Sequence, residues 1–259
     1  MPGLLNLNSY HPESYWNEVA KRISGRNDNI LLAGDDEPFY TYKRKKFLKL
    51  FNQIPFNNKI VLEIGSGPGG NLNEILKVSP KELHGADVSD EMINLSSRLL
   101  KTANIKVDKI DGETLPYLSK YFDISFTSTV LQHNTDEKML KCIIKEICRV
   151  SGSDIYIFER IEKKIKGNKL NLGRPVSYYK EIFEQNSFKL IETEFLYIQI
   201  SYLICGAIRK VFNSRKRKEG EPISRPAYYL QRIFLPITSI LDPIFKEKRD
   251  LAMLHFKRI

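Results

Sequence analysis

The sequence has few cysteines and lacks long apolar runs. Its three cysteines, Cys142, Cys148 and Cys205, are too few and too scattered for a disulfide framework or a zinc site, which favours a reduced, cytoplasmic environment. No window reaches about 18 apolar residues, so a membrane-spanning helix is not expected. The first 29 residues are mixed and polar, unlike the leader of a secreted protein.

Motifs of several enzyme classes are absent as well. The sequence contains neither an HExxH motif nor paired cysteines, so we expect no bound metal. The G-x-x-x-x-G-K-[ST] phosphate loop is missing, which argues against an ATPase. A Ser-His-Asp pattern, internal repeats and low-complexity segments are missing too.

Positive charge is in excess and unevenly distributed. The chain of 259 residues carries a formal net charge of +10. Residues 201–259 alone hold 13 Lys and Arg against 5 Asp and Glu, a net charge of +8. This asymmetry predicts an acidic partner, such as nucleic acid, an anionic membrane surface or a phosphorylated substrate.

The most informative stretch is VLEIGSGPGGNL, from Val61 to Leu72. A short apolar run is followed by four glycines and then by a helical pattern, an arrangement that places backbone N–H groups beside a ligand. Read loosely, it also fits the dinucleotide fingerprint G-x-G-x-x-G. However, Glu63 lies inside the predicted buried strand and needs a partner. A ligand with a cationic centre fits this acid better than a pyrophosphate does.

A second acid follows the next predicted strand, 82–87. Asp87 lies 22 residues beyond Gly65, and an acid at the end of this strand can accept hydrogen bonds from both hydroxyls of a ribose. By itself, Asp87 can also simply begin a turn. Ser89 is a predicted helix N-cap, with Asp90 and Glu91 in the first turn.

These two stretches resemble a known family. LEIGSGPG, residues 62–69, resembles the first motif of class I S-adenosylmethionine-dependent methyltransferases, and GADVSDEM, residues 85–92, resembles their second motif. The resemblance implies S-adenosylmethionine as cofactor. It implies these binding residues: Glu63, Gly65, Ser66, Gly67, Gly69, Asp87, Val88, Asp111, Gly112 and Gln132. Asp111 would accept a hydrogen bond from the adenine amino group, although a turn-forming Asp-Gly would look the same locally.

Residues 127–133, after a predicted strand at 121–126, resemble the family's fourth motif, which faces the transferring methyl group. Gln132 and His133 are therefore expected at the ligand. His133 can act as a general base for a hydroxyl group, because its ordinary pKa lies near neutrality. It can equally be a capping residue before the helix predicted at 136–150.

The remaining patterns complete a doubly wound α/β fold with seven strands, in the order 3-2-1-4-5-7-6 that the resemblance implies. Helices are predicted at 9–26 and 40–51, and a basic loop at 163–173. A further helix is predicted to run to Gln185 with Ser177 as its N-cap. The other strands are predicted at 105–110, 155–158, 188–197 and 251–257, the last antiparallel. The predicted parts are a helical cap (1–57), a cofactor-binding core (58–197), an insertion (198–250) and the final strand (251–259).

Candidate substrate-binding residues lie in two helices. The family often caps its pocket with a helical pair before the first strand, which implies that Tyr40, Tyr42 or Arg44 faces the ligand. The alternative is that these aromatic residues belong to the core and the basic residues are solvated. Arg174 and Tyr178, around the start of the helix before the sixth strand, are also candidates.

The insertion, 198–250, is longer than a strand connection needs. Apolar stretches at 195–208 and 227–245 flank the run Arg215-Lys216-Arg217-Lys218. Apolar faces beside basic residues suit an interfacial element on an anionic bilayer, on the inner face of the membrane. A helical lid over the substrate pocket is the other interpretation, and the two are compatible.

The favoured function is O-methylation of a glycan, a lipid-linked or another small-molecule acceptor. Residues 34–44 resemble small bacterial methyltransferases of surface-polysaccharide and natural-product pathways. An RNA methyltransferase is the alternative, supported by the basic residues at 201–259. The Asn/Asp-Pro-Pro-Tyr/Phe motif of base N-methylating relatives is, however, missing after the fourth strand. A non-catalytic binding protein with this fold is the third possibility.

Overall fold

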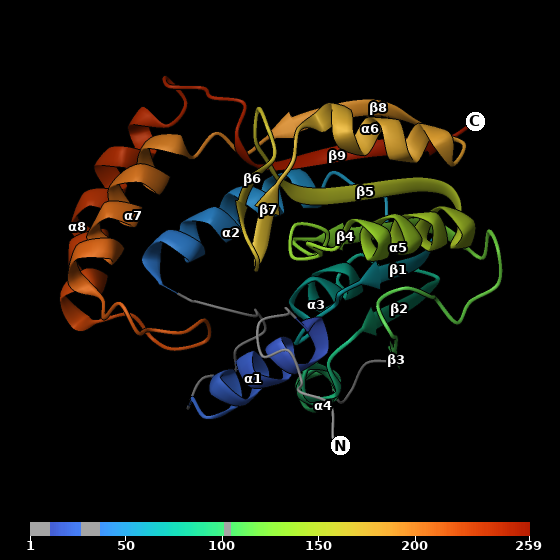
Figure 1. Ribbon diagram of the computed structural model, residues 1–259, viewed down its shortest axis with the longest axis horizontal. Helices are drawn as coiled ribbons and strands as arrows, with labels where there is room; N and C mark the ends of the chain where they lie inside the picture. The colour runs from blue at the N-terminus through green and yellow to red at the C-terminus, as the bar shows by residue number, and fades with distance from the viewer. Residues whose placement is uncertain (1–10, 27–36, 101–104) are drawn as a thin grey trace, which may run out of the picture.

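The structure is a computed structural model that describes residues 11–26, 37–100 and 105–259. A seven-stranded sheet has helices on both faces, and a pair of helices lies beyond one end (Figure 1). The strands, in their order across the sheet, are β3 (Lys106–Lys109), β2 (Glu82–Asp87), β1 (Ile60–Ile64), β4 (Phe122–Ser128), β5 (Ser151–Ile161), β9 (Asp250–Arg258) and β8 (Phe188–Phe195). Strand β9 is antiparallel to both neighbours. The predicted fold and strand order are confirmed.

Three local predictions are wrong or incomplete. Strand β5 begins at Ser151 rather than at 155, because the chain passes into it directly from the preceding helix. The predicted loop at 163–173 contains a small hairpin, β6 (Lys166–Asn168) and β7 (Asn171–Gly173). Helix α6 (Val176–Gln185) has Pro175, not Ser177, at its N-cap position, because the backbone changes there from extended, with a ψ of 156°, to helical.

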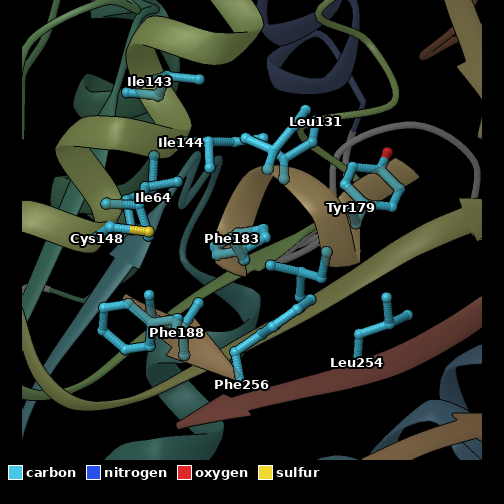
Figure 2. Close-up of a cluster of buried hydrophobic side chains, with 14 of the residues drawn as sticks. Ile64, Leu131, Ile143, Ile144, Cys148, Tyr179, Phe183, Phe188, Leu254 and Phe256 are labelled. Atoms are coloured by element: carbon cyan, nitrogen blue, oxygen red, sulfur yellow. The ribbon is translucent and has the colours of Figure 1, made fainter. Parts of the chain in front are cut away.

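One face of the sheet is covered by α6 and α5 (Glu137–Val150). Figure 2 shows side chains of these helices beside those of β8 and β9. In β5, Ile155 and Ile157 belong to this core, whereas Tyr156 and Phe158 belong to the core on the other face. This alternation follows from the period of two in a strand.

The opposite face is covered by α2 (Pro38–Phe51) and α3 (Gly70–Leu76). Phe47 and Phe51, one helical turn apart, contact Phe158 and Phe126 of the sheet at ring-centroid distances of 4.7 and 5.3 Å. These two aromatic residues of α2 therefore serve the core. Part of the 34–44 segment lies outside the described residues.

At the β3 edge, α1 (Pro12–Ser24) packs on α4 (Asp90–Leu99) through Val19, Ile23 and Met92. Ser89 is the N-cap of α4, since its Oγ accepts a hydrogen bond of 3.1 Å from the N–H of Met92. The predicted helix at 9–26 thus begins at Pro12 in the described part of the chain. These contacts fix α1 beside the end of β2.

The insertion forms α7 (Gln199–Phe212) and α8 (Arg225–Leu241), which pack on each other and on α2 (Figure 1, left). Buried Asp242 ties them together, because it accepts hydrogen bonds from the N–H groups of Ile200 and Ser201 and from the hydroxyl of Tyr42. Within the described ranges, no helix is both long and apolar enough to cross a bilayer.

Candidate functional site

A cavity lies where β1, β2 and β4 end, the edge at which ligands bind in open α/β sheets. Its wall combines the β1–α3 turn, the end of β2, the segment after β4 and one side of α1. The lining residues include Pro12, Trp16, Arg44, Glu63, Gly65, Ser66, Gly67, Asn71, Asp87, Val88, Ile110, Gly112, Val130, Leu131, His133, Met139 and Ile143.

The β1–α3 turn follows a path that only glycine takes easily. Gly65 and Gly67 have φ values of 74° and 52°, in the left-handed region. A Cβ added at Gly65 would lie 2.3 Å from Cγ2 of Val130. A Cβ at Gly69 would instead meet Leu100, which directly follows α4, so Gly69 serves packing and does not line the cavity.

Glu63 has the partner that its burial demands. Its side chain is 1% exposed, and Oε1 accepts a hydrogen bond of 2.6 Å from Nδ2 of Asn71. Asn71 in turn accepts a hydrogen bond from Arg44, whose Nη2 also donates to the carbonyl of Gly70. Burial raises the pKa of Glu63 to about 8, while the Asn71 and Arg44 interactions oppose the rise. The acid is thus held with its second oxygen, Oε2, lacking a hydrogen-bond partner within the described chain.

Asp87 lies across the same cavity. Its Oδ2 accepts a hydrogen bond of 2.8 Å from the N–H of Gly67, and Oδ1 accepts one of 2.8 Å from the N–H of Ser89. Burial raises its pKa to about 6, against the effect of these two donors. The carboxylate therefore joins the glycine turn to the start of α4.

The two neighbouring candidates Asp111 and Gly112 have different places in the structure. Gly112 lines the cavity together with Val88, whereas Asp111 does not. The carboxylate of Asp111 accepts hydrogen bonds from the N–H groups of Glu113 and Thr114 and from the Thr114 hydroxyl. These bonds, that of Thr114 first, lower its pKa. In this structure Asp111 has the turn-forming role, and adenine contact remains a prediction.

The segment after β4 is shaped by Glu159, which sequence reasoning did not select. This fully buried carboxylate accepts hydrogen bonds from the Thr127 hydroxyl and from three consecutive backbone N–H groups, those of Val130, Leu131 and Gln132, at 2.9 to 3.1 Å. Burial raises its pKa to about 7, and the four donors oppose that rise. Glu159 thus fixes the path that brings His133 to the cavity.

His133 lines the cavity with a defined tautomer. Its Nδ1 lies 2.8 Å from the carbonyl of Leu170, so Nδ1 carries the proton and donates it. Gln132 accepts the N–H of Arg160 through Oε1, which turns its Nε2 toward Nε2 of His133 at 3.3 Å. Trp16 lies edge-on to the imidazole, 5.1 Å between centroids. Burial lowers the pKa of His133, so the ring is neutral at pH 7.

Gln132 and three substrate-binding candidates are not brought to the cavity lining. Gln132 is held behind His133. The hydroxyl of Tyr42 donates to Asp242 of the insertion, 2.8 Å away. The Arg174 guanidinium is fully buried. It donates to the carbonyls of Leu131 and Asn134 and so stabilises the backbone on both sides of His133.

Tyr178 donates its hydroxyl to Glu137 at the start of α5 and does not line the cavity either. Arg44 is the one substrate-binding candidate that does, and its bonds link it to Glu63 through Asn71. Sequence reasoning missed Asn71, Glu159, Met139 and Ile143 as parts of the site. Local sequence patterns do not predict the contacts that bring these residues to the site, although Glu159 is recognisable in the sequence as an acid at the end of a predicted strand. Among the described residues, no group of His, Cys, Asp and Glu could hold a metal ion.

The residues present fit S-adenosylmethionine. The unpartnered Oε2 of Glu63 offers a buried acceptor to a cationic group. The glycine turn leaves the backbone bare at the cavity, and Asp87 ends β2 beside it. Ile110, Met139 and Ile143 add an apolar wall of the kind that a purine ring requires.

Comparisons with known proteins agree. A family model described as a methyltransferase domain matches residues 61–153. The uncharacterized methyltransferase YdaC of Bacillus subtilis (strain 168) is 26% identical over 153 residues, which cover 58% of this chain and 82% of YdaC. Magnesium protoporphyrin IX methyltransferase (ChlM) of Synechocystis PCC 6803, solved with bound S-adenosylmethionine, superposes with a TM-score of 0.59 at 12% identity, covering 95% of both chains.

The fold is shared more widely. The [4+2]-cyclase SpnF superposes with a TM-score of 0.64 at 12% identity, covering 95% of this chain and 94% of SpnF. The assignment therefore rests on the matched domain and the cavity as well as on the fold. Together, the matched domain, the cavity and the fold support a class I methyltransferase that uses S-adenosylmethionine as its cofactor.

Proposed function

We propose that this methyltransferase acts on a hydroxyl group of a glycan, a lipid-linked or another small-molecule acceptor, with His133 as general base. The observation that carries the proposal is the state of the imidazole. Its Nδ1–H is fixed on the carbonyl of Leu170, which leaves the lone pair on Nε2. A hydroxyl group is a poor nucleophile until a base accepts its proton.

The bond from Gln132 to Nε2 is weak enough to be replaced. At 3.3 Å it lies at the long end of N–H donor distances, and it joins two neutral groups. An acceptor hydroxyl in the cavity can take its place and donate to Nε2 at a shorter distance. When bound, S-adenosylmethionine supplies an electrophilic methyl carbon on a cationic sulfur. His133 would take the hydroxyl proton on Nε2 while the hydroxyl oxygen forms its bond to the methyl carbon and the carbon–sulfur bond breaks, with its electron pair left on the sulfur.

Surrounding contacts support His133 in this role. Trp16 covers one side of the ring, and Glu159 holds the backbone from Val130 to Gln132. Burial lowers the pKa of the imidazole, which keeps the base unprotonated at neutral pH. Positioning of this kind supplies much of the rate in a displacement reaction.

The test measures transfer of radioactive methyl groups from S-adenosylmethionine to three acceptor fractions: soluble glycans and small molecules, extracted lipids, and RNA. We expect label in one of the first two fractions, resistant to mild alkali as an ether is. His133→Asn should lower the rate by about 10²- to 10⁴-fold, the usual contribution of a general base, and leave cofactor affinity unchanged.

The control is His84→Asn, because His84 lies on β2, does not line the cavity and bonds to Glu82. The wild-type rate should fall as the pH drops through the pKa of His133, which burial places below the ordinary value for histidine, and this dependence should vanish in His133→Asn. Label only in RNA would overturn the acceptor class. If the His133→Asn enzyme had the wild-type rate and pH profile, His133 would not be the general base.

A further inference from the structure

We infer that the α7–α8 hairpin is a docking surface for an anionic phospholipid bilayer. This goes beyond the choice of acceptor and does not depend on it. Of the twenty large apolar side chains that are exposed in the described chain, thirteen lie between 202 and 245. Such a concentration is unusual on the surface of a soluble protein and marks an interaction site.

The exposed apolar residues of α8 form a stripe. Tyr229, Ile233, Ile237, Ile240 and Ile244 are each 59 to 71% exposed. Their spacing of four, four, three and four residues places them on one face of the helix and of the turn that follows it. The buried face carries Ala227, Gln231 and Thr238 instead. Helix α7 adds Leu203 and Val211, which are 53 and 71% exposed.

The charge beside the stripe has one sign. Helices α7 and α8 contain four basic residues and no Asp or Glu. Arg209 pairs with Glu37, whereas Lys210, Arg225 and Arg232 are exposed. The connection between the helices, residues 213–224, exposes Arg215, Lys216 and Lys218, while Arg217 donates to carbonyls of its own loop.

The acids of this region offset only part of that charge. Residues 199–248 hold ten Lys and Arg against four Asp and Glu, a net charge of +6. The four acids bond within the chain: Glu219 to Tyr15, Glu221 to the N–H of Lys218, Asp242 to Ser201, and Glu247 to Arg249. Apolar side chains surrounded by bases complement a surface that offers acyl chains below a layer of phosphates.

The two other occupants fit less well. A second copy of the chain would bring the same exposed bases against each other across a symmetric interface, without acids to pair them. RNA would use the bases but leave the apolar stripe in water. A bilayer uses both, and the hairpin lies at the outer end of the molecule, beyond α2 (Figure 1).

The hairpin also contacts the helix that lines the cavity. Glu219 of the connection accepts a hydrogen bond of 2.5 Å from the hydroxyl of Tyr15, and its carbonyl accepts one of 2.6 Å from Arg22. Both partners lie on α1, whose Trp16 packs on His133. A bilayer-bound hairpin would therefore hold the cap of the cavity near the membrane surface.

The test is co-sedimentation of the full chain with vesicles of phosphatidylcholine alone or with 30 mol% phosphatidylserine. The wild type should bind the anionic vesicles at least tenfold more tightly. Arg215→Ala/Lys216→Ala/Lys218→Ala should lower that affinity about 100-fold, since each base near such a surface contributes about fivefold. Ile233→Gln/Ile240→Gln should lower it at least tenfold.

Matched controls separate these effects from general changes of surface. Ile165→Gln/Ile191→Gln removes two isoleucines that are each 53% exposed elsewhere. Lys106→Ala/Lys141→Ala/Lys180→Ala removes three exposed bases from β3, α5 and α6, far from the hairpin (Figure 1). Both should bind vesicles within twofold of the wild type. None of the changed residues lines the cavity, so all variants should bind S-adenosylmethionine normally, which verifies their fold.

Several results would overturn the inference. One is that the wild-type protein does not bind vesicles, or binds neutral and anionic vesicles equally. Another is vesicle binding that survives Ile233→Gln/Ile240→Gln, together with an RNA gel shift sensitive only to the loss of bases. A third is a wild-type dimer in light scattering that the isoleucine variant converts to a monomer, without vesicle binding by either.

Discussion

Replacing Glu63 by glutamine tests whether the acid at the end of β1 holds a proton in the cofactor-free protein. The carboxyl is 1% exposed, and burial raises its pKa to about 8 from an ordinary 4.5. Between these two pH values the folded protein keeps a proton that the unfolded chain releases. Glutamine has nearly the same shape and no such proton.

The sign of the effect follows from this difference. Because the folded-state pKa lies above the unfolded one, the wild type loses stability as the pH rises from 4.5, and the loss is complete above about 8. Each pKa unit corresponds to about 1.4 kcal/mol, so the full shift has a ceiling of about 5 kcal/mol. Between pH 6 and 8 we expect the unfolding free energy of Glu63→Gln, relative to wild type, to increase by about 2 kcal/mol.

Urea unfolding of the cofactor-free proteins at pH 6, 7, 8 and 9, followed by circular dichroism, measures this quantity. Glu181→Gln, which changes an exposed glutamate of α6, is the matched control and should show no such trend. A stability difference between Glu63→Gln and wild type that stays constant from pH 6 to 9 would refute the reasoning, since the carboxyl would then be ionised in the folded protein.

Cofactor binding should change in the opposite direction. A cationic ligand favours the ionised carboxylate, so wild-type affinity for S-adenosylmethionine should rise with pH, by up to about tenfold per unit, and level off near 8. Glu63→Gln should bind more weakly and lose this dependence. The single tryptophan of the chain, Trp16, lines the cavity, so its fluorescence reports the titration.

Three further variants test the rest of the site. Asp87→Ala should weaken S-adenosylmethionine binding by about 1–3 kcal/mol in calorimetry, because a buried acceptor is lost; unchanged affinity would exclude Asp87 from the site. Gly67→Val should abolish binding while circular dichroism stays nearly the same, since valine rarely adopts a φ of 52° and its side chain would be added to the cavity lining; normal binding would place the ligand elsewhere. Glu159→Gln should lower the free energy of unfolding, measured in urea, by about 1–3 kcal/mol, because an amide cannot accept all four hydrogen bonds. A variant as stable as the wild type would show that the segment after β4 does not need these bonds.

The sequence predicted the parts of the site that depend on neighbours along the chain. Gly65, Gly67 and Asp87 follow strands at fixed spacings, and a strand–turn–helix unit places them at one edge of the sheet wherever it occurs. The seven-strand order was predictable for the same reason, from a resemblance carried by local motifs.

The rest of the site depends on contacts between distant segments. Glu159 reaches backbone groups 27 to 29 residues earlier in the chain, and Arg174 supports carbonyls about 40 residues earlier. No local pattern distinguishes such residues from solvated ones. The stripe on α8 has a similar ambiguity, because its helical period is the same whether the stripe meets a core or water. Only the packing of α7 and α8 on α2 decides which face remains outside.

The insertion between β8 and β9 adds a helical hairpin to the fold without interrupting the pairing of these two strands. The two strands pair from Phe188 opposite Arg258 to Phe195 opposite Ala252, right up to the point where the insertion begins and ends. A short turn would close the same pair, and joining them through about fifty residues costs only about 2 kcal/mol of extra loop entropy. The pairing of the two strands therefore tolerates an insertion of this length at little cost to the sheet. As inferred above, the residues that bind the bilayer and the residues that bind the cofactor lie in separate parts of the chain.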